Sequence, residues 1–242
     1  MKTNQPWQKK ITTLVLLLML EISTSAHAGL FGFGDDKWKE EALLHDGSTM
    51  IVSRSQSYGG GHEIGQSPPM NKASISFTLP GTHRTISWNE TLYPNDPNSE
   101  NLILLAVDIV DGTPFLITSP VGRMTTNKWG CLYDQRYVVL KYDGKAWNQI
   151  PMSELPLEIT KSNVIISTQG QMLGSHSGVV TAKEIRALNS GGGSGSPEFL
   201  TTFERKPPDQ PQPPCVKLIN YKGEWIRPND DLARKMIDSV KK

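Results

Sequence analysis

Apolar and polar residues alternate one by one along several stretches of the chain. This is the pattern of a β-strand with one face in the core. The clearest stretch is 73–79 (ASISFTL), in which every second residue from Ala73 to Leu79 is apolar. A Pro-Gly pair follows and the alternation resumes at Ile86 and Trp88, so we expect two paired strands here.

Three Asp-Gly dipeptides separate further apolar runs, at positions 46–47, 111–112 and 143–144. Asp-Gly suits the positive φ angles of a type I′ turn, so each predicts a β-hairpin. Residues 163–167 (NVIIS) predict one more short strand. The Asp-Gly spacings have no fixed period, which disfavours a β-propeller. The sequence predicts a mainly β fold, an antiparallel sandwich or irregular barrel built from hairpins, with one or two short C-terminal helices.

Two segments carry helix signals. Thr181 and Glu184 have the spacing of a capping box, Ile185 and Leu188 follow on one face, and Gly191 is a stop signal. Residues 231–240 place their apolar side chains on one face, with acids before them and lysines after them, which suits the helix dipole.

The N-terminus has the pattern of a secretory signal. Lysines precede an apolar stretch over residues 11–20, and Ala26 and Ala28 fit the rule for a cleavage site. We expect residues 1–28 to be removed before Gly29, and the mature protein to be periplasmic or secreted. An uncleaved signal anchor is the alternative. No later segment is long enough to span a membrane, and the apolar run 102–110 contains Asp108.

Linkers divide the rest of the chain. A β domain is expected over residues 29–189, followed by a Gly/Ser- and Pro-rich linker over 190–214 (with SGGGSGS and PPDQPQPP). The remaining segment, 215–242, is too short to bury a core alone, so we expect it to dock on the β domain. A disordered tail is the alternative, and the apolar residues Ile219, Trp225 and Ile226 argue against it.

Both cysteines lie in the expected mature chain. Cys131 and Cys215 are an even pair in an oxidising compartment and predict one disulfide. A nucleophile or metal ligand is the alternative, but neither cysteine has CxxC spacing or a neighbouring histidine.

Composition narrows the class of protein. The 242 residues are 37% hydrophobic, which is too little for a protein with several membrane spans. Lys and Arg number 25 and Asp and Glu 24, so the net charge of +1 provides no field that would favour nucleic acid. No cofactor and no metal site is expected.

Candidate chemistry is sparse. His62 and Glu63 follow three glycines, but the second histidine and the helix of a zinc protease are missing, so a binding loop or a plain connecting loop remains. His176 stands where a nucleophile elbow has its serine. Residues 95–100 (NDPNSE) resemble a turn more than a calcium loop. Trp129, beside Cys131, is either packed on a disulfide or exposed for binding.

Several stretches resemble a family of secreted proteins of Gram-negative bacteria, mainly proteobacteria, to which no activity is assigned. They are residues 38–57 (WKEEALLHDGSTMIVSRSQS), 62–66 (HEIGQ), 76–80 (SFTLP), 111–118 (DGTPFLIT), 127–130 (NKWG) and 137–156. The resemblance covers most of the expected β domain and implies export and a mainly β fold. It implies no substrate and no catalytic residue.

Two classes of function remain open. The first is a non-enzymatic envelope module that binds an unknown envelope protein or a small ligand through residues 58–70 and 121–136, with His62, Glu63 and Trp129 as contact candidates. The second is a periplasmic hydrolase that uses His62, Glu63 and possibly His176.

Overall fold

The structure is a computed structural model that describes residues 36–58, 70–91, 102–120, 129, 136–166, 178–190, 198–206 and 218–240. Most of its elements are antiparallel strands, which confirms the predicted mainly β fold. The described strands form open sheets, and none of these sheets closes into a barrel. Of the two architectures expected, the packing fits the sandwich.

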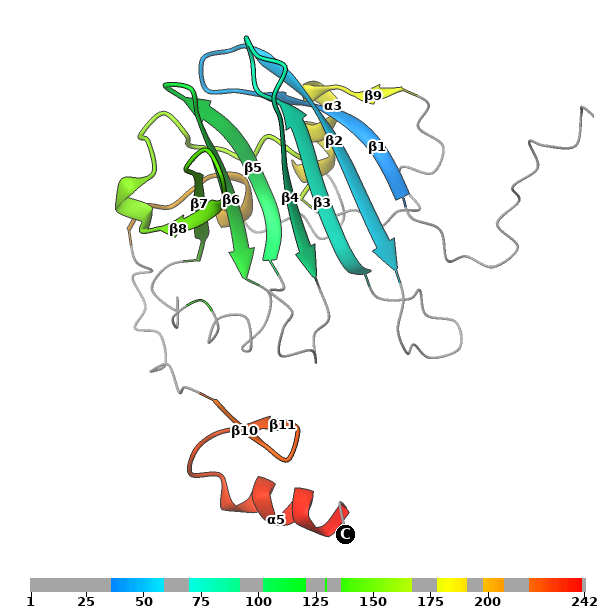
Figure 1. The fold of residues 1–242 in the computed structure, drawn as a ribbon, viewed down its shortest axis with the longest axis vertical. Helices are drawn as coiled ribbons and strands as arrows, with labels where there is room; N and C mark the ends of the chain where they lie inside the picture. Colours follow the sequence, from blue (N-terminus) through cyan, green and yellow to red (C-terminus); the bar gives the residue numbers. More distant parts are fainter. Residues whose placement is uncertain are drawn as a thin grey trace, which may run out of the picture. The chain divides into compact units, whose positions relative to one another are not determined.

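The first sheet contains five strands in the order β4-β3-β2-β1-β9 (Figure 1). β1 to β4 pair antiparallel as consecutive neighbours, whereas β9 runs parallel to β1. The predicted alternation is confirmed, because Ile75, Phe77, Ile86 and Trp88 are all buried. The bounds are β1 (Asp36–Leu43), β2 (Thr49–Tyr58), β3 (Met70–Thr78), β4 (Thr85–Thr91) and β9 (Val179–Val180).

The second sheet is an antiparallel meander of β5 (Leu102–Val110), β6 (Thr113–Pro120), β7 (Val138–Tyr142) and β8 (Trp147–Ile150). β5 and β6 are buried along almost their whole length because both faces of this sheet are covered. On one face, Leu102, Leu104, Val107, Leu116, Val138 and Leu140 share a core with the inward residues of the first sheet. On the other face lie η2 (Met152–Glu154), Leu155, Ile159 and Phe203.

All three Asp-Gly dipeptides connect antiparallel neighbours, as predicted. Only Asp111 and Gly112 both have positive φ, 51° and 72°, as a type I′ turn requires. In the other two turns only the glycine has positive φ. There the Asp side chain instead accepts hydrogen bonds from the following backbone, as Asp46 does from Ser48 and Asp143 from Lys145.

The prediction of a strand over 163–167 is wrong for its described part, 163–166, which belongs to no strand. Side chains form the hydrogen bonds with the backbone of this segment that a neighbouring strand would otherwise form. Ile165 N–H donates to Glu40, Ile166 N–H donates to Asn189, and the Asn189 amide donates to the carbonyl of Val164. The apolar run reflects burial of this segment beside α3, because periodicity does not separate a buried strand from a buried loop.

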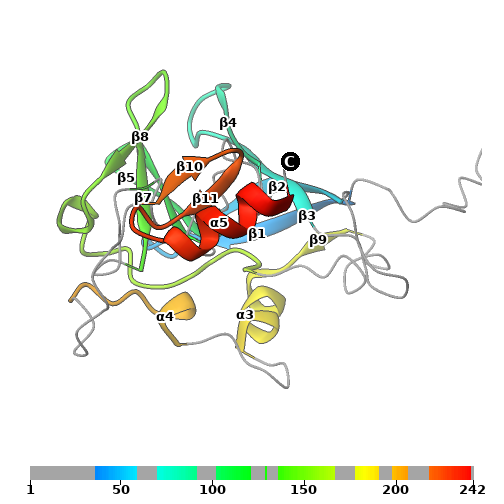
Figure 2. The same ribbon diagram turned by 90° about the horizontal axis from the view of Figure 1, so that it is seen from below.

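The helix α3 (Ala182–Ser190) has the predicted capping box. Thr181 N–H donates to the Glu184 carboxylate at 2.8 Å, and Glu184 N–H donates to the Thr181 hydroxyl at 3.3 Å. The helix lies beside the β1–β9 edge in both ribbon views (Figures 1 and 2) and packs through Ile185 against Trp38 and Val180. Leu188, expected on the same face, is 41% exposed, and Asn189 is buried instead.

Part of the predicted linker packs with the β domain. Within residues 190–214 lies the one-turn helix α4 (Glu198–Thr201), followed by Phe203, which is buried in the second core and stacks edge-on with Tyr137. The Tyr137 hydroxyl donates to the carbonyl of Phe199. Composition alone concealed this contact because the packed residues lie between Gly/Ser-rich and Pro-rich stretches.

The C-terminal segment contains the hairpin of β10 (Ile219–Tyr221) and β11 (Glu224–Ile226), and then the predicted helix α5 (Asp231–Val240). Helix and hairpin contact each other through Asp238, which accepts hydrogen bonds from Tyr221 and Lys222. The apolar face of α5 is exposed at Leu232, Met236 and Val240. In the described part of the chain, no helix has the length and apolar character needed to cross a membrane.

One charged pair is buried inside the first sheet. The Arg54 guanidinium donates to Glu40 at 2.8 Å, and the exposed side-chain fractions are 3% and 0%. The Trp38 indole also donates to Glu40, and the Arg54 guanidinium lies 5.3 Å from the Trp38 ring centre. The pair therefore has hydrogen-bond partners on several sides, which a buried charge needs.

Candidate functional site

Most of the residues predicted to act lie outside the described residues. This is so for His62, Glu63 and His176, and for the predicted disulfide cysteines Cys131 and Cys215.

Trp129 is described. It is half-buried and packs against the core between the two sheets. Its indole nitrogen is buried and has no hydrogen-bond partner in the part of the chain that the structure describes. The side chain is thus not fully exposed, and the expected packing on a disulfide concerns cysteines that lie outside the described residues.

The structure brings together a different histidine and acid. His45 lies in the β1–β2 turn, which closes through the hydrogen bond from Leu44 N–H to the Ser48 carbonyl. Asp108 lies on β5 of the other sheet. Asp108 accepts a hydrogen bond from the His45 backbone N–H at 3.0 Å, and its other oxygen lies 2.8 Å from His45 Nδ1. The imidazole ring is therefore held by its Nδ1 side.

Electrostatics favour the protonated form of this histidine. The hydrogen bond to Asp108 raises the pKa of His45 above its ordinary value of 6.5, against the opposing effect of burial. The charges of Asp108, Asp46 and Glu158 raise it further. The Asp108 side chain is only 4% exposed, whereas that of His45 is 19% exposed. A buried carboxylate thus orients a ring that is partly exposed.

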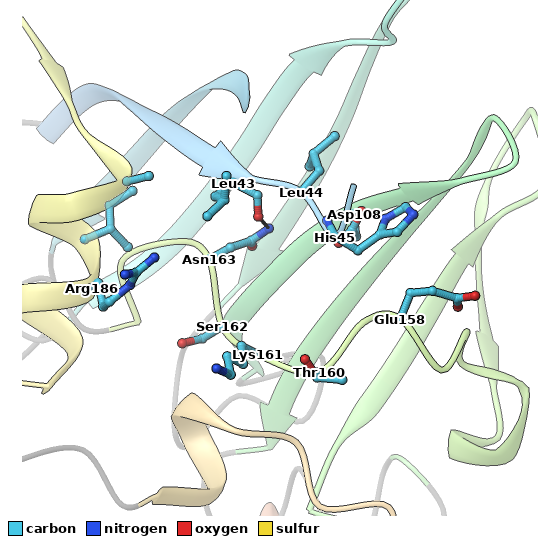
Figure 3. A pocket seen from close by; sticks show the side chains of 12 residues that line it. Leu43, Leu44, His45, Asp108, Glu158, Thr160, Lys161, Ser162, Asn163 and Arg186 are labelled. Carbon is cyan, nitrogen blue, oxygen red and sulfur yellow. Dashed lines mark hydrogen bonds and ion pairs between the residues drawn. The ribbon is translucent and has the colours of Figure 1, made fainter. Parts of the chain in front are cut away.

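A hollow of about 210 Å³ opens beside this pair (Figure 3). β1 and its turn, β5, residues 158–163 and α3 form its walls. In the view of Figure 3, Arg186 lies at one end, His45 with Asp108 and Glu158 lie toward the other, and Lys161 lies between them. The hollow therefore carries acids and cations at different places along its length.

Asn163 fixes the floor of this hollow. Its side-chain amide donates to the carbonyls of Leu43 on β1 and Val107 on β5, at 3.0 and 2.8 Å, and its oxygen accepts from Val107 N–H at 3.0 Å. Its backbone N–H donates to the carbonyl of Leu105, where the β5–β6 register shifts. Leu105 is the extra residue at this register shift, and its carbonyl is therefore hydrogen-bonded by the segment that lines the site.

A second hollow, of about 570 Å³, lies between α3 and α4. It shares Lys161, Ser162 and Arg186 with the first hollow. The rest of its lining is Asn189, Ser190, Glu198, Thr201 and Thr202. Lys161 pairs with Thr202 as an isolated bridge, and Ser162 N–H donates to the carbonyl of Thr201. These backbone contacts fix α4 against the segment that lines both hollows.

A third hollow lies on the outward face of the first sheet and is lined by Lys37, Lys39 and serines of β2 and β3. The register places Ser53 opposite Ser76 and Ser55 opposite Ser74. The Ser55 and Ser74 hydroxyls lie 2.7 Å apart and bond to each other. This face is rich in serine hydroxyls, and the hydroxyls of Ser55 and Ser74 are already hydrogen-bonded to each other.

The described residues contain no cluster of three or more His, Cys, Asp or Glu side chains that could hold a metal ion. Thr160 and Ser162 line the first hollow, but within the described part of the chain neither hydroxyl is hydrogen-bonded to His45. His45 therefore has an orienting acid in Asp108, and no described nucleophile is bonded to it.

Sequence reasoning missed this site because its parts are distant in the chain. His45 precedes an Asp-Gly turn, and this pattern indicates only a hairpin. Asp108 interrupts an apolar run, and a lone acid in a strand buried on both faces indicates that the acid has a partner. The chain matches no family model, and no curated protein or solved structure resembles it closely enough to count as a match.

Proposed function

We propose that the chain is an exported protein of the cell envelope that binds a small ligand in the hollow beside His45, without enzymatic chemistry. Export is supported by the signal pattern of residues 1–28, and the periplasm is the expected compartment. The mainly β scaffold supports the proposal because rigid sheets place short loops and turns precisely enough for binding.

The observation that carries the proposal is the fixed orientation of His45. Nδ1 is engaged by Asp108, so Nε2 is the ring nitrogen left to meet a ligand. The hollow next to it combines apolar side chains, Leu44 and Ile185, with polar groups from the 158–163 segment. A few polar groups placed on a partly apolar wall are typical of small-molecule sites.

Native mass spectrometry of the protein from a periplasmic extract tests this function. We expect a bound small molecule in the wild type and in His83→Gln, which changes an exposed histidine of the β3–β4 turn. We expect its loss in His45→Gln. A bare monomer in all three samples, or equal retention by His45→Gln, would contradict the proposal. The denatured mass in the same experiment reports whether Gly29 is the first residue and whether Cys131 and Cys215 form a disulfide.

The second candidate is a hydrolase of the envelope that uses His62, Glu63 and possibly His176. The structure describes none of these three residues, but it adds the His45–Asp108 pair, and a histidine oriented by a buried acid is part of many hydrolase sites. The test is hydrolysis of envelope esters or peptides by the purified protein. Activity that is lost in His62→Ala or His45→Ala, and kept in His83→Ala, would support the hydrolase and contradict the non-enzymatic binding function.

A further inference from the structure

We propose that Lys161, Ser162 and Arg186 form an anion-binding site, here named the cationic junction, and that the ligand is an elongated molecule with a carboxylate or phosphate group bound there. This inference deepens the proposed function and rests on it for the identity of the ligand. The anion site itself rests on geometry and charge at the junction.

The position of these residues is the first argument. Both hollows are lined by Lys161, Ser162 and Arg186, so the three residues lie where one hollow meets the other. The first hollow extends from them to His45, and the second extends to Glu198 on α4. With volumes of about 210 and 570 Å³, the two together offer the room of a small-molecule site. A ligand that fills both must pass over the junction.

The state of the two cations is the second argument. In the part of the chain that the structure describes, neither the Lys161 ammonium nor the Arg186 guanidinium makes a hydrogen bond or an ion pair. Acids do line the hollows, but none of them pairs with the junction: Asp108 is bonded to His45, and Glu158 and Glu198 make no ion pair with described residues. Two positive charges therefore face one groove with their donors available.

The donor set is the third argument. A guanidinium presents a planar fork that fits carboxylate and phosphate oxygens, and a lysine adds a mobile point charge. Ser162 follows Lys161 directly in the chain and lines both hollows. Donors of this kind recognise an oxyanion and offer nothing specific to a neutral or cationic group.

The backbone under the junction is rigid. Lys161 and Ser162 are tied to the end of α4 by the bridge to Thr202 and the hydrogen bond to Thr201. Arg186 lies on α3, which is fixed by its capping box and by buried Ile185. The backbone that carries both cations is thus fixed before a ligand arrives, so binding has to order only their exposed side chains.

The test is an NMR titration of the isotopically labelled exported protein with inorganic phosphate and, separately, acetate, each against chloride at equal ionic strength. We expect saturable chemical-shift changes at the backbone amides of residues 160–163 and 186–190, with a dissociation constant of about 1 mM or below. The double variant Lys161→Gln/Arg186→Gln should bind at least about tenfold more weakly. Lys183→Gln, an exposed lysine on the same helix, is the matched control and should bind like the wild type.

Shifts that do not saturate, that lie elsewhere, or that persist in the double variant would overturn the inference. A stronger response to phosphate than to acetate assigns a phosphate ligand, and the reverse assigns a carboxylate. The mass-spectrometric experiment separates this result from the proposed function. If the bound molecule is lost in His45→Gln but kept in the double variant, the binding function stands and the anion site falls. If phosphate titrates the junction but no molecule accompanies the protein, the anion site stands and the proposed function falls.

Discussion

The carboxylate of Asp108 binds His45 at two points, the backbone N–H and the ring nitrogen Nδ1. Asp108 belongs to the second sheet, and His45 to a turn of the first. This contact and the side chain of Asn163 join the two sheets at the β1 and β5 ends where the first hollow opens. The candidate site therefore lies where the two sheets are hydrogen-bonded to each other. Its polar residues His45, Asp108 and Asn163 are binding candidates and also stabilise the packing of the sheets.

The His45–Asp108 bond predicts a pH-dependent stability. Because the bond raises the pKa of His45 in the folded state, it stabilises the fold fully below the ordinary value of 6.5. This contribution is lost as pH rises through the folded pKa. We expect the difference in free energy of unfolding between wild type and His45→Gln, measured by urea denaturation, to shrink from pH 5 to pH 8. His83→Gln should leave the wild-type profile unchanged, and an equal profile for His45→Gln would show that the bond adds no pH-dependent stability.

The buried pair of Glu40 and Arg54 predicts a large effect of removing one partner. Glu40→Gln leaves the Arg54 charge buried, and such a loss costs about 3–5 kcal/mol. Urea denaturation followed by tryptophan fluorescence measures it, with Glu154→Gln, an exposed glutamate of η2, as the control.

Replacing both members of that pair separates charge burial from packing. Glu40→Leu combined with Arg54→Met should be more stable than Glu40→Gln, because no charge remains in the core. A double variant less stable than the single one would mean that the contacts of Glu40 with Trp38 and Ile165 matter more than the charge.

Removing the Asn163 side chain should locally weaken the contact between the two sheets. In Asn163→Ala, three backbone groups lose their partner: the Leu43 carbonyl and both the N–H and the carbonyl of Val107. We expect a loss of about 2–3 kcal/mol, since unsatisfied buried groups cost about 1–3 kcal/mol each and water can reach part of this site. Hydrogen exchange should quicken at β1 and β5 first. Asn89→Ala, on the exposed face of β4, should change neither measurement.

The β5–β6 turn predicts a purely conformational effect. Gly112 has a φ of 72°, and a Cβ added there would meet no atom within 4 Å. Gly112→Ala should therefore cost about 1–2 kcal/mol through backbone strain alone. Gly112→Asn should cost less, because asparagine tolerates this conformation. Thermal unfolding of both variants checks the order, and equal losses would mean that the turn changes its type.

The sequence predicted the strands best where one face is buried and the other is wet. Residues 73–79, and Ile86 with Trp88 after them, show this, because alternation along a strand follows directly from the two environments of its faces. It predicted the α3 and α5 helices from caps and spacing, which are local. It erred at 163–166, where an apolar run without alternation turned out to be a buried segment held by the side chains of Glu40 and Asn189.

The candidate site lay beyond sequence reasoning for a physical reason. Local patterns record which face of a segment is buried, and they do not record what a side chain meets across the core. Asp108 and His45 are 63 positions apart, and Asn163 is 120 positions from Leu43. The mainly β class and its hairpins were thus determined by the sequence alone. Only the packing of these distant segments on one another decided that His45, the buried Asp108 and two cations without a partner among the described residues line the same hollow.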